Sequence, residues 1–123
     1  MERAALADDV VRFIENRIDS VPELEALMLL RDSAPRSWSA GEIAARIYVE
    51  PAQAAALLQN LERKKLLLAA EAGFRFREED PDAAIFERVA AAYRGNLVAV
   101  ASLIHSKSSA AVREFARAFR FKE

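Results

Sequence analysis

Two helix-start signals lie close together in the middle of this 123-residue chain and constrain its fold more than any other feature. Ser39-Ala-Gly-Glu42 is a capping-box pattern, in which the serine hydroxyl accepts from a first-turn amide while the glutamate reaches back. Pro51 suits the first position of a helix, where no backbone donor is needed. These signals predict a short helix over 40–47, a turn, and a longer helix over 51–64. Together they form a helix-turn-helix pattern.

A β-hairpin is predicted directly after the second of these helices. Leu66 to Ala70 is a short apolar run, and Glu71-Ala-Gly73 supplies a turn signal. Phe74-Arg-Phe-Arg77 then alternates apolar and basic residues with a period of two, as a strand with one buried face does. Arg75 and Arg77 are therefore expected on one face of the second strand, opposite the two phenylalanines.

Further helices are predicted on both sides of this central segment. Ser20-Val-Pro-Glu23 is a second capping-box pattern, and Asp80-Pro81 is an N-cap followed by a first-position proline. Apolar positions keep helical phase across Gly95-Asn96, so one long helix is preferred there to a break at which Asn96 caps a new helix. The predicted flanking helices cover 3–19, 22–32, 81–105 and 109–120.

The composition supports a mainly α fold. The chain has 26 alanines but only three glycines and four prolines, so strong helix formers far outnumber helix breakers. Its length fits one domain over 1–123, with a core over 20–80 and flanking helices over 1–19 and 81–123.

Several classes of protein are excluded by what the sequence lacks. There is no cysteine and only one histidine, so thiolate nucleophiles, disulfides and two-histidine metal sites are impossible within the chain. No phosphate-binding glycine loop or nucleophile elbow is present, and we expect no enzymatic activity, no metal and no cofactor. The first residues lack a secretory pattern, and the longest apolar run is far too short for a membrane span. A cytoplasmic protein that makes no membrane contact is expected.

The helix-turn-helix pattern contains Glu42-Ile43-Ala44, Glu50-Pro51, Leu57-Leu58, Leu61-Glu62 and Leu66. With these motifs, residues 24–77 resemble a winged helix-turn-helix domain, of the general kind found in MarR-like and PadR-like bacterial regulators. In such domains a glycine often occupies the turn position held here by Tyr48 and the position before the wing held here by Lys65. The resemblance implies a mainly α, winged helix-turn-helix fold with a short β-hairpin wing, and a role in transcription regulation.

The resemblance also implies that helix 51–64 and the wing bind duplex DNA. Amide side chains can pair with base edges, an alanine methyl can contact thymine, and cations bind phosphates. The candidate DNA contacts are Gln53, Ala56, Asn60, Arg63, Lys64, Lys65, Arg75 and Arg77.

A second function is left open by the charge pattern. The net charge is −1, and the outer face of helix 51–64 is rich in alanine, which suits a winged-helix module that binds a protein partner and no DNA. The arrangement of charge discriminates the two functions. A continuous basic stripe would favour DNA, whereas interruption by Glu50, Glu71 and Glu78 would favour the interaction module.

Assembly into a homodimer is predicted from the last long helix. Its apolar stripe spans about six turns, which one small winged domain can hardly cover. The candidate interface residues are Phe86, Val89, Tyr93, Leu97, Val100 and Ile104.

Overall fold

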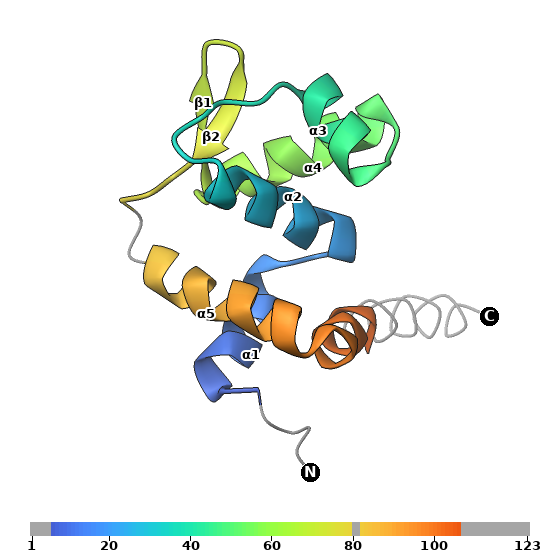
Figure 1. The fold of residues 1–123 in the computed structure, drawn as a ribbon, viewed down its shortest axis with the longest axis vertical. Helices are drawn as coiled ribbons and strands as arrows, with labels where there is room; N and C mark the ends of the chain where they lie inside the picture. The colour runs from blue at the N-terminus through green and yellow to red at the C-terminus, as the bar shows by residue number, and fades with distance from the viewer. Residues whose placement is uncertain (1–5, 80–81, 107–123) are drawn as a thin grey trace, which may run out of the picture.

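The computed structural model describes residues 6–79 and 82–106 of the chain, and within them the fold is mainly helical with one small antiparallel sheet. In Figure 1, α2 lies between a lower layer that contains α1 and α5 and an upper layer that contains α3, α4 and the hairpin. The predicted helix over 109–120 lies outside the described residues. The elements are α1 (Asp8–Arg17), α2 (Val21–Asp32), α3 (Ala40–Ile47), α4 (Pro51–Arg63), β1 (Leu67–Ala70), β2 (Gly73–Phe76) and α5 (Ala83–Gly95), followed by a helical segment over 97–106.

The starts of α2, α3 and α4 follow the predicted patterns, whereas α5 begins at Ala83 with Asp82 as its N-cap and not at the predicted residue 81. At α3 the capping box is complete, because the Ser39 hydroxyl accepts from the Glu42 amide at 3.1 Å and the Glu42 carboxylate accepts from the Ser39 amide at 2.9 Å. At α2 only half of the box forms. Ser20 accepts from the Glu23 amide at 3.2 Å, but the Glu23 carboxylate accepts from the Asp19 amide.

Two non-glycine residues adopt left-handed backbone angles at the ends of α3 and α4. Tyr48 has φ 61° and ψ 50° and ends α3, while Lys65 has φ 68° and leads from α4 towards the hairpin. These are the two positions at which the winged domains often have glycine. A side chain with a Cβ pays about 1–2 kcal/mol for this conformation, so both turns are strained by their own residues.

The hairpin gains a third, one-residue strand from the segment before α3. β1 and β2 pair antiparallel, with Leu67 opposite Phe76. On the other edge of β2, the Trp38 amide donates to the Phe74 carbonyl at 2.8 Å and the Phe74 amide donates back at 2.9 Å. This bridge fastens the hairpin to the start of α3.

Phe86 joins the lower helices to the hairpin. Its ring lies 5.8 Å from that of Phe13 on α1 and 6.0 Å from that of Phe76 on β2, and the side chain is buried. The core therefore runs without interruption from α1 through α5 to the sheet.

The prediction of one continuous helix over 81–105 is wrong. The first helix ends at Gly95, Asn96 has φ −151° and ψ 63°, and a second helical segment covers 97–106. The Asn96 carbonyl accepts from the Val100 amide at 3.2 Å, so the new helix begins there. Glycine and asparagine both favour helix ends over helix interiors, and here this local preference outweighs the continuity of the apolar stripe.

The apolar stripe predicted as a dimer interface is covered mainly by the chain itself. Of its six members only Leu97 is exposed, at 52%. The reason is that α1 packs on α5 from one side and α2 lies on the other, as Figure 1 shows, so this small fold covers more of the stripe than its length suggested. The members buried inside the chain are Phe86, Val89, Tyr93, Val100 and Ile104.

Candidate nucleic-acid interface

The outward face of α4 is uncovered. The helix packs on α3, α2 and β1, and its inner face buries Ala54, Leu57, Leu58 and Leu61. Three of the predicted contacts, Gln53, Ala56 and Arg63, lie on the exposed side as expected. Gln59 is also exposed, and sequence reasoning missed it. Its position, three residues after Ala56 and four before Arg63, was the available signal, because those spacings lie on one helix face.

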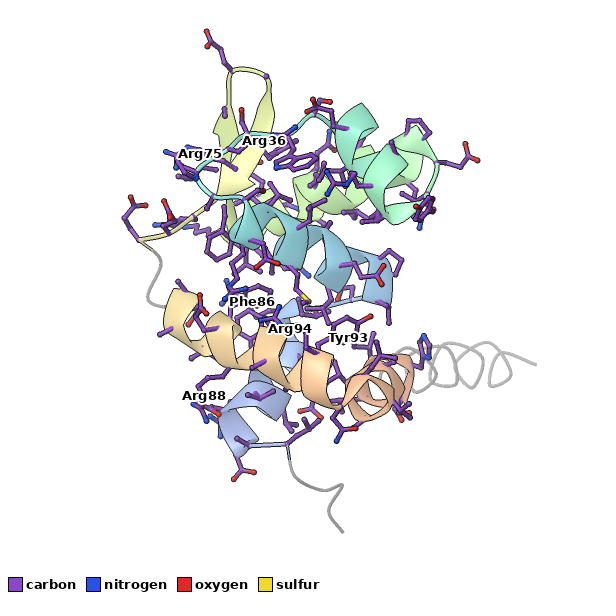
Figure 2. The ribbon with its side chains drawn as sticks, viewed as in Figure 1. Arg36, Arg75, Phe86, Arg88, Tyr93 and Arg94 are labelled. Carbon is purple, nitrogen blue, oxygen red and sulfur yellow. The ribbon has the colours of Figure 1, made fainter. Side chains whose placement is uncertain are left out.

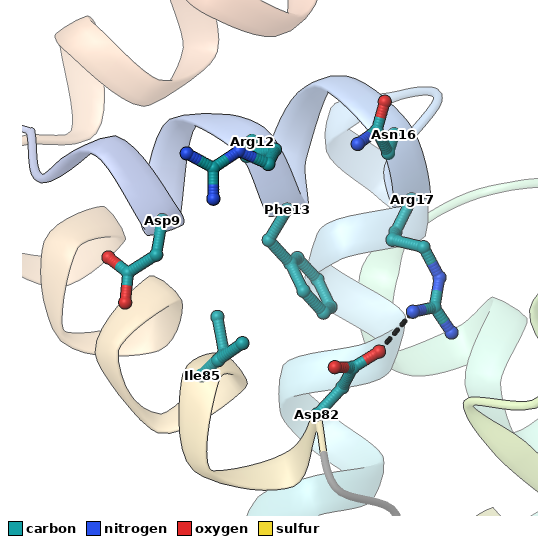
Figure 3. Close-up of a pocket in the computed structure, with 7 residues that line it drawn as sticks. All are labelled: Asp9, Arg12, Phe13, Asn16, Arg17, Asp82 and Ile85. Carbon is teal, nitrogen blue, oxygen red and sulfur yellow. Dashed lines mark hydrogen bonds and ion pairs between the residues drawn. The ribbon is translucent and has the colours of Figure 1, made fainter.

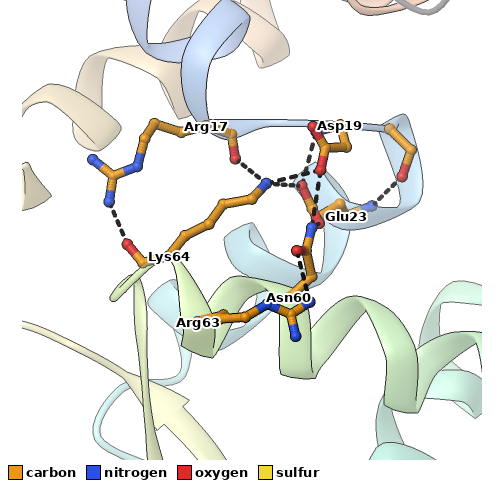
Figure 4. Close-up of polar contacts among 7 residues, drawn as sticks. Arg17, Asp19, Glu23, Asn60, Arg63 and Lys64 are labelled. Atoms are coloured by element: carbon orange, nitrogen blue, oxygen red, sulfur yellow. Dashed lines mark hydrogen bonds and ion pairs between the residues drawn. The ribbon is translucent and has the colours of Figure 1, made fainter.

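Asn60 and Lys64 were predicted as DNA contacts, but their side chains lie in an internal polar network (Figure 4). The Asn60 amide donates to Asp19 at 2.9 Å and to Glu23 at 2.8 Å. The Lys64 ammonium donates to the same two carboxylates at 3.1 and 3.0 Å, and to the Arg17 carbonyl at 2.7 Å. We correct the prediction for these two residues, because both side chains satisfy acids at the junction of α1 and α2.

Glu23 explains why this network forms. Its side chain is 2% exposed, and a carboxylate buried to that degree requires partners for its charge. Lys64, Asn60 and the Asp19 amide supply them. The network thereby fixes the C-terminal end of α4 against the start of α2, while the Arg17 guanidinium donates to the Lys64 carbonyl at 2.7 Å.

Three predicted cations remain near the end of α4 and the base of the hairpin. Arg63 is exposed and donates to the Asn60 side chain at 3.1 Å, and Lys65 is exposed beside it. Arg77 donates to the Lys65 carbonyl at 3.5 Å, which places it at the same end of the sheet. Arg75 lies further along β2, and Phe76 between the two arginines is buried, as the alternating pattern predicts.

Exposed acids lie among these cations. Glu50 precedes α4, Glu62 lies next to Arg63, and Glu71 lies in the turn at the tip of the hairpin. Glu78 is also exposed, just after Arg77. Among the described residues these acids interrupt the basic groups along the chain, which is the pattern expected of a protein-binding module and not of a continuous basic stripe.

Arg36 and Arg46 are two further cations near the hairpin, which no sequence motif indicated. Trp38 is buried, and its indole N–H donates to the Ser33 hydroxyl at 2.8 Å. The Arg36 guanidinium carbon lies 3.8 Å from the Trp38 ring centre, and that of Arg46 lies 5.2 Å from it. Figure 2 shows Arg36 and Arg75 beside the hairpin, and Trp38 pairs with the residue next to Arg75.

A separate pocket of about 170 Å³ lies between α1 and the start of α5, away from the outward face of α4 (Figure 3). An ion pair between Arg17 and Asp82 borders it, and Phe13 and Ile85 form its apolar side. Over residues 6–79 and 82–106 no group of three metal-binding side chains gathers, and no helix has the length and apolar character to cross a membrane. Comparison of the chain with protein families, curated proteins and solved structures finds no match.

Proposed function

We propose that the chain is a winged-helix module that binds duplex DNA and acts in transcription regulation. The observation that carries the proposal is the uncovered face of α4, which follows α3 across a tight turn and ends beside a hairpin. A helix placed in this way can enter the major groove, whose width admits one α-helix.

The chemistry of the face supports base recognition through amides. Gln53 and Gln59 are exposed on α4, and a glutamine amide can donate and accept at the edge of an adenine. Ala52 and Ala56 let the backbone approach the bases and offer methyl contacts to thymine. Phosphate contacts fall to Arg63, Lys65 and Arg75, because Lys64 is engaged internally and Arg77 donates to the Lys65 carbonyl.

The first experiment measures the salt dependence of DNA binding. Three phosphate contacts predict a log–log slope of about −2.7, at roughly 0.9 for each contact. Fluorescence anisotropy with genomic fragments at low and moderate salt would give this slope. Replacing Arg63 and Lys65 by alanine should weaken binding to all sequences alike and make the slope shallower by about 1.8. An unchanged slope would remove these residues from the interface.

The second experiment tests whether Gln53 recognises bases or only contributes to binding of any DNA sequence. Gln53→Ala should reduce the discrimination between a selected site and bulk DNA by about 1–3 kcal/mol and leave non-specific binding nearly unchanged. Asn16→Ala, which removes an exposed amide from α1, is the matched control and should change neither quantity. Equal loss on every sequence would show that Gln53 does not read bases.

A protein-binding role is the second candidate, and two observations favour it. Ala52 and Ala56 leave the centre of the α4 face apolar, and Glu71 places a negative charge at the hairpin tip, where a DNA phosphate would repel it. Absence of DNA binding by the folded wild-type chain at low salt would favour this second function over the first.

A further inference from the structure

Tyr48 is highly exposed and also has a left-handed backbone conformation, so neither packing nor backbone preference explains a tyrosine at this position. Its side chain is 91% exposed, more than any other large apolar side chain of the described residues. Its backbone also has φ 61°, in the left-handed region that favours glycine. Nothing in the described chain offsets this strain through the tyrosine ring, since no hydrogen bond or ring contact holds it there.

The chain's other tyrosine, Tyr93, is buried and hydrogen-bonded, in contrast to Tyr48. Tyr93 is 8% exposed, and its hydroxyl donates to Glu25 at 3.3 Å. The folding of the turn at Tyr48 requires only the backbone, whose amide donates to the Ala44 carbonyl. Glycine would make the same turn without a Cβ clash. The tyrosine side chain therefore costs local stability without a packing role in the described chain.

The position of Tyr48 points to DNA. It ends α3 and lies three residues before Pro51, where α4 begins, so an exposed aromatic side chain extends from the turn that leads into the uncovered helix. Arg46, two residues earlier, adds an exposed cation, while Glu50 adds an opposing charge. The phenolic hydroxyl of a tyrosine can donate to a phosphate oxygen, and its ring can pack against a deoxyribose.

We propose that Tyr48 is a DNA-backbone contact that fixes the entry of α4 into the groove. The inference rests on the proposed function and adds a contact that the charge pattern did not indicate. The Tyr48 side chain is 91% exposed and makes no hydrogen bond or ring contact with the described residues, so its removal should affect folding and binding in opposite directions.

The first test compares stability and affinity in one variant. Tyr48→Gly should melt no lower than the wild type, and a few degrees higher where the strain is fully released. The same variant should bind duplex DNA about tenfold more weakly. Tyr48→Asn, which also tolerates left-handed angles, should show the same stability and the same weaker binding. Asn16→Ala, at an exposed position of α1, should bind as the wild type does.

The second test uses chemical protection. Tetranitromethane should nitrate Tyr48 in the free chain and spare the buried Tyr93, and peptide mass spectrometry distinguishes the two. Saturating duplex DNA should protect Tyr48 from nitration. The reference is the chain without DNA, treated in the same buffer at the same ionic strength.

The outcomes separate this inference from the function on which it rests. Wild-type affinity in Tyr48→Gly and Tyr48→Asn, or undiminished nitration in the bound complex, would overturn the role of Tyr48 and leave DNA binding standing. No DNA binding by the folded wild type at low salt would overturn the proposed function, and this contact with it.

Discussion

At the scale of single residues, backbone conformation determines which positions tolerate change. Gly73 has φ 152°, and a Cβ added there would lie 1.9 Å from the Trp38 carbonyl oxygen. That oxygen accepts from the Phe74 amide, so the obstruction falls on the bridge that joins the hairpin to the start of α3. The absence of a side chain at Gly73 is a requirement of the three-strand pairing.

Gly73→Ala should therefore lower the free energy of unfolding by about 2–4 kcal/mol, because backbone atoms must move to admit the methyl group. Urea denaturation followed by circular dichroism measures this change. Gly41→Ala is the matched control, since its added Cβ meets nothing closer than 4.0 Å and α3 should gain up to about 1 kcal/mol from the better helix former. Equal stability of Gly73→Ala and the wild type would contradict the observed bridge.

Which α4 side chains face outward could be predicted only in part. Helical spacing correctly placed Gln53 and Ala56 on the exposed face. It did not separate Gln59 from Asn60, because each of them lies three or four residues from both Ala56 and Arg63. Their roles are decided by Asp19 and Glu23, whose position depends on the tertiary packing of α1 and α2.

At the scale of elements, three helix ends meet at one polar junction. The C-terminal ends of α1 and α4 and the start of α2 share the contacts of Glu23, Lys64 and Arg17. A buried ion pair adds little stability compared with an apolar pair, but removal of one partner leaves a charge without compensation. The junction therefore restricts how α4 is oriented more than it stabilises the chain.

Lys64→Met should destabilise the fold by about 3 kcal/mol, because the buried Glu23 loses its cation. The double variant Glu23→Gln with Lys64→Met should recover much of this loss. Thermal or urea unfolding of both variants measures the difference. A Lys64→Met chain of wild-type stability would show that the network does not hold Lys64, and would return this residue to the set of candidate phosphate contacts.

The ion pair between Arg31 on α2 and Glu87 on α5 should make the stability of the chain depend on pH. Arg31 donates to Glu87 through its Nε at 2.9 Å and through a second nitrogen, and this hydrogen bonding lowers the pKa of Glu87 below its ordinary value. The ionised form of Glu87 is thus favoured by folding. Its contribution is present above the pKa of the unfolded chain and is lost as the pH falls through the lower pKa of the folded chain.

Glu87→Gln should consequently reduce stability at neutral pH and converge with the wild type in acid, below the ordinary range of carboxyl groups near pH 4. The difference should be small, because the Glu87 side chain is 59% exposed and solvent screens the pair. Unfolding curves from pH 3 to 7 test this, with Glu15→Gln on the exposed side of α1 as control. A constant difference across that range would contradict the assigned ion pair.

At the scale of the whole molecule, the sequence predicted most elements but not how they cover one another. Capping patterns and apolar periods indicated α1 to α4 and the hairpin, because these signals act within a few residues. The break at Asn96 and the covering of the α5 stripe depend on contacts between distant segments, such as those of Phe86 with Phe13 and Phe76. No local pattern carries that information.

Homodimer formation stays a prediction, and it now depends on a different surface. Most of the stripe is internal, but Leu97 and Val98 are 52% and 72% exposed at the start of the segment over 97–106. If a second copy covers them, Leu97→Asp should convert a dimer to a folded monomer, as measured by sedimentation with circular dichroism. Val100→Asp should instead unfold the chain, because Val100 is fully buried and an unpaired charge there costs several kcal/mol. A wild-type chain that sediments as a folded monomer at tens of micromolar would exclude the dimer, and DNA binding would then have to rely on a single α4 in one groove.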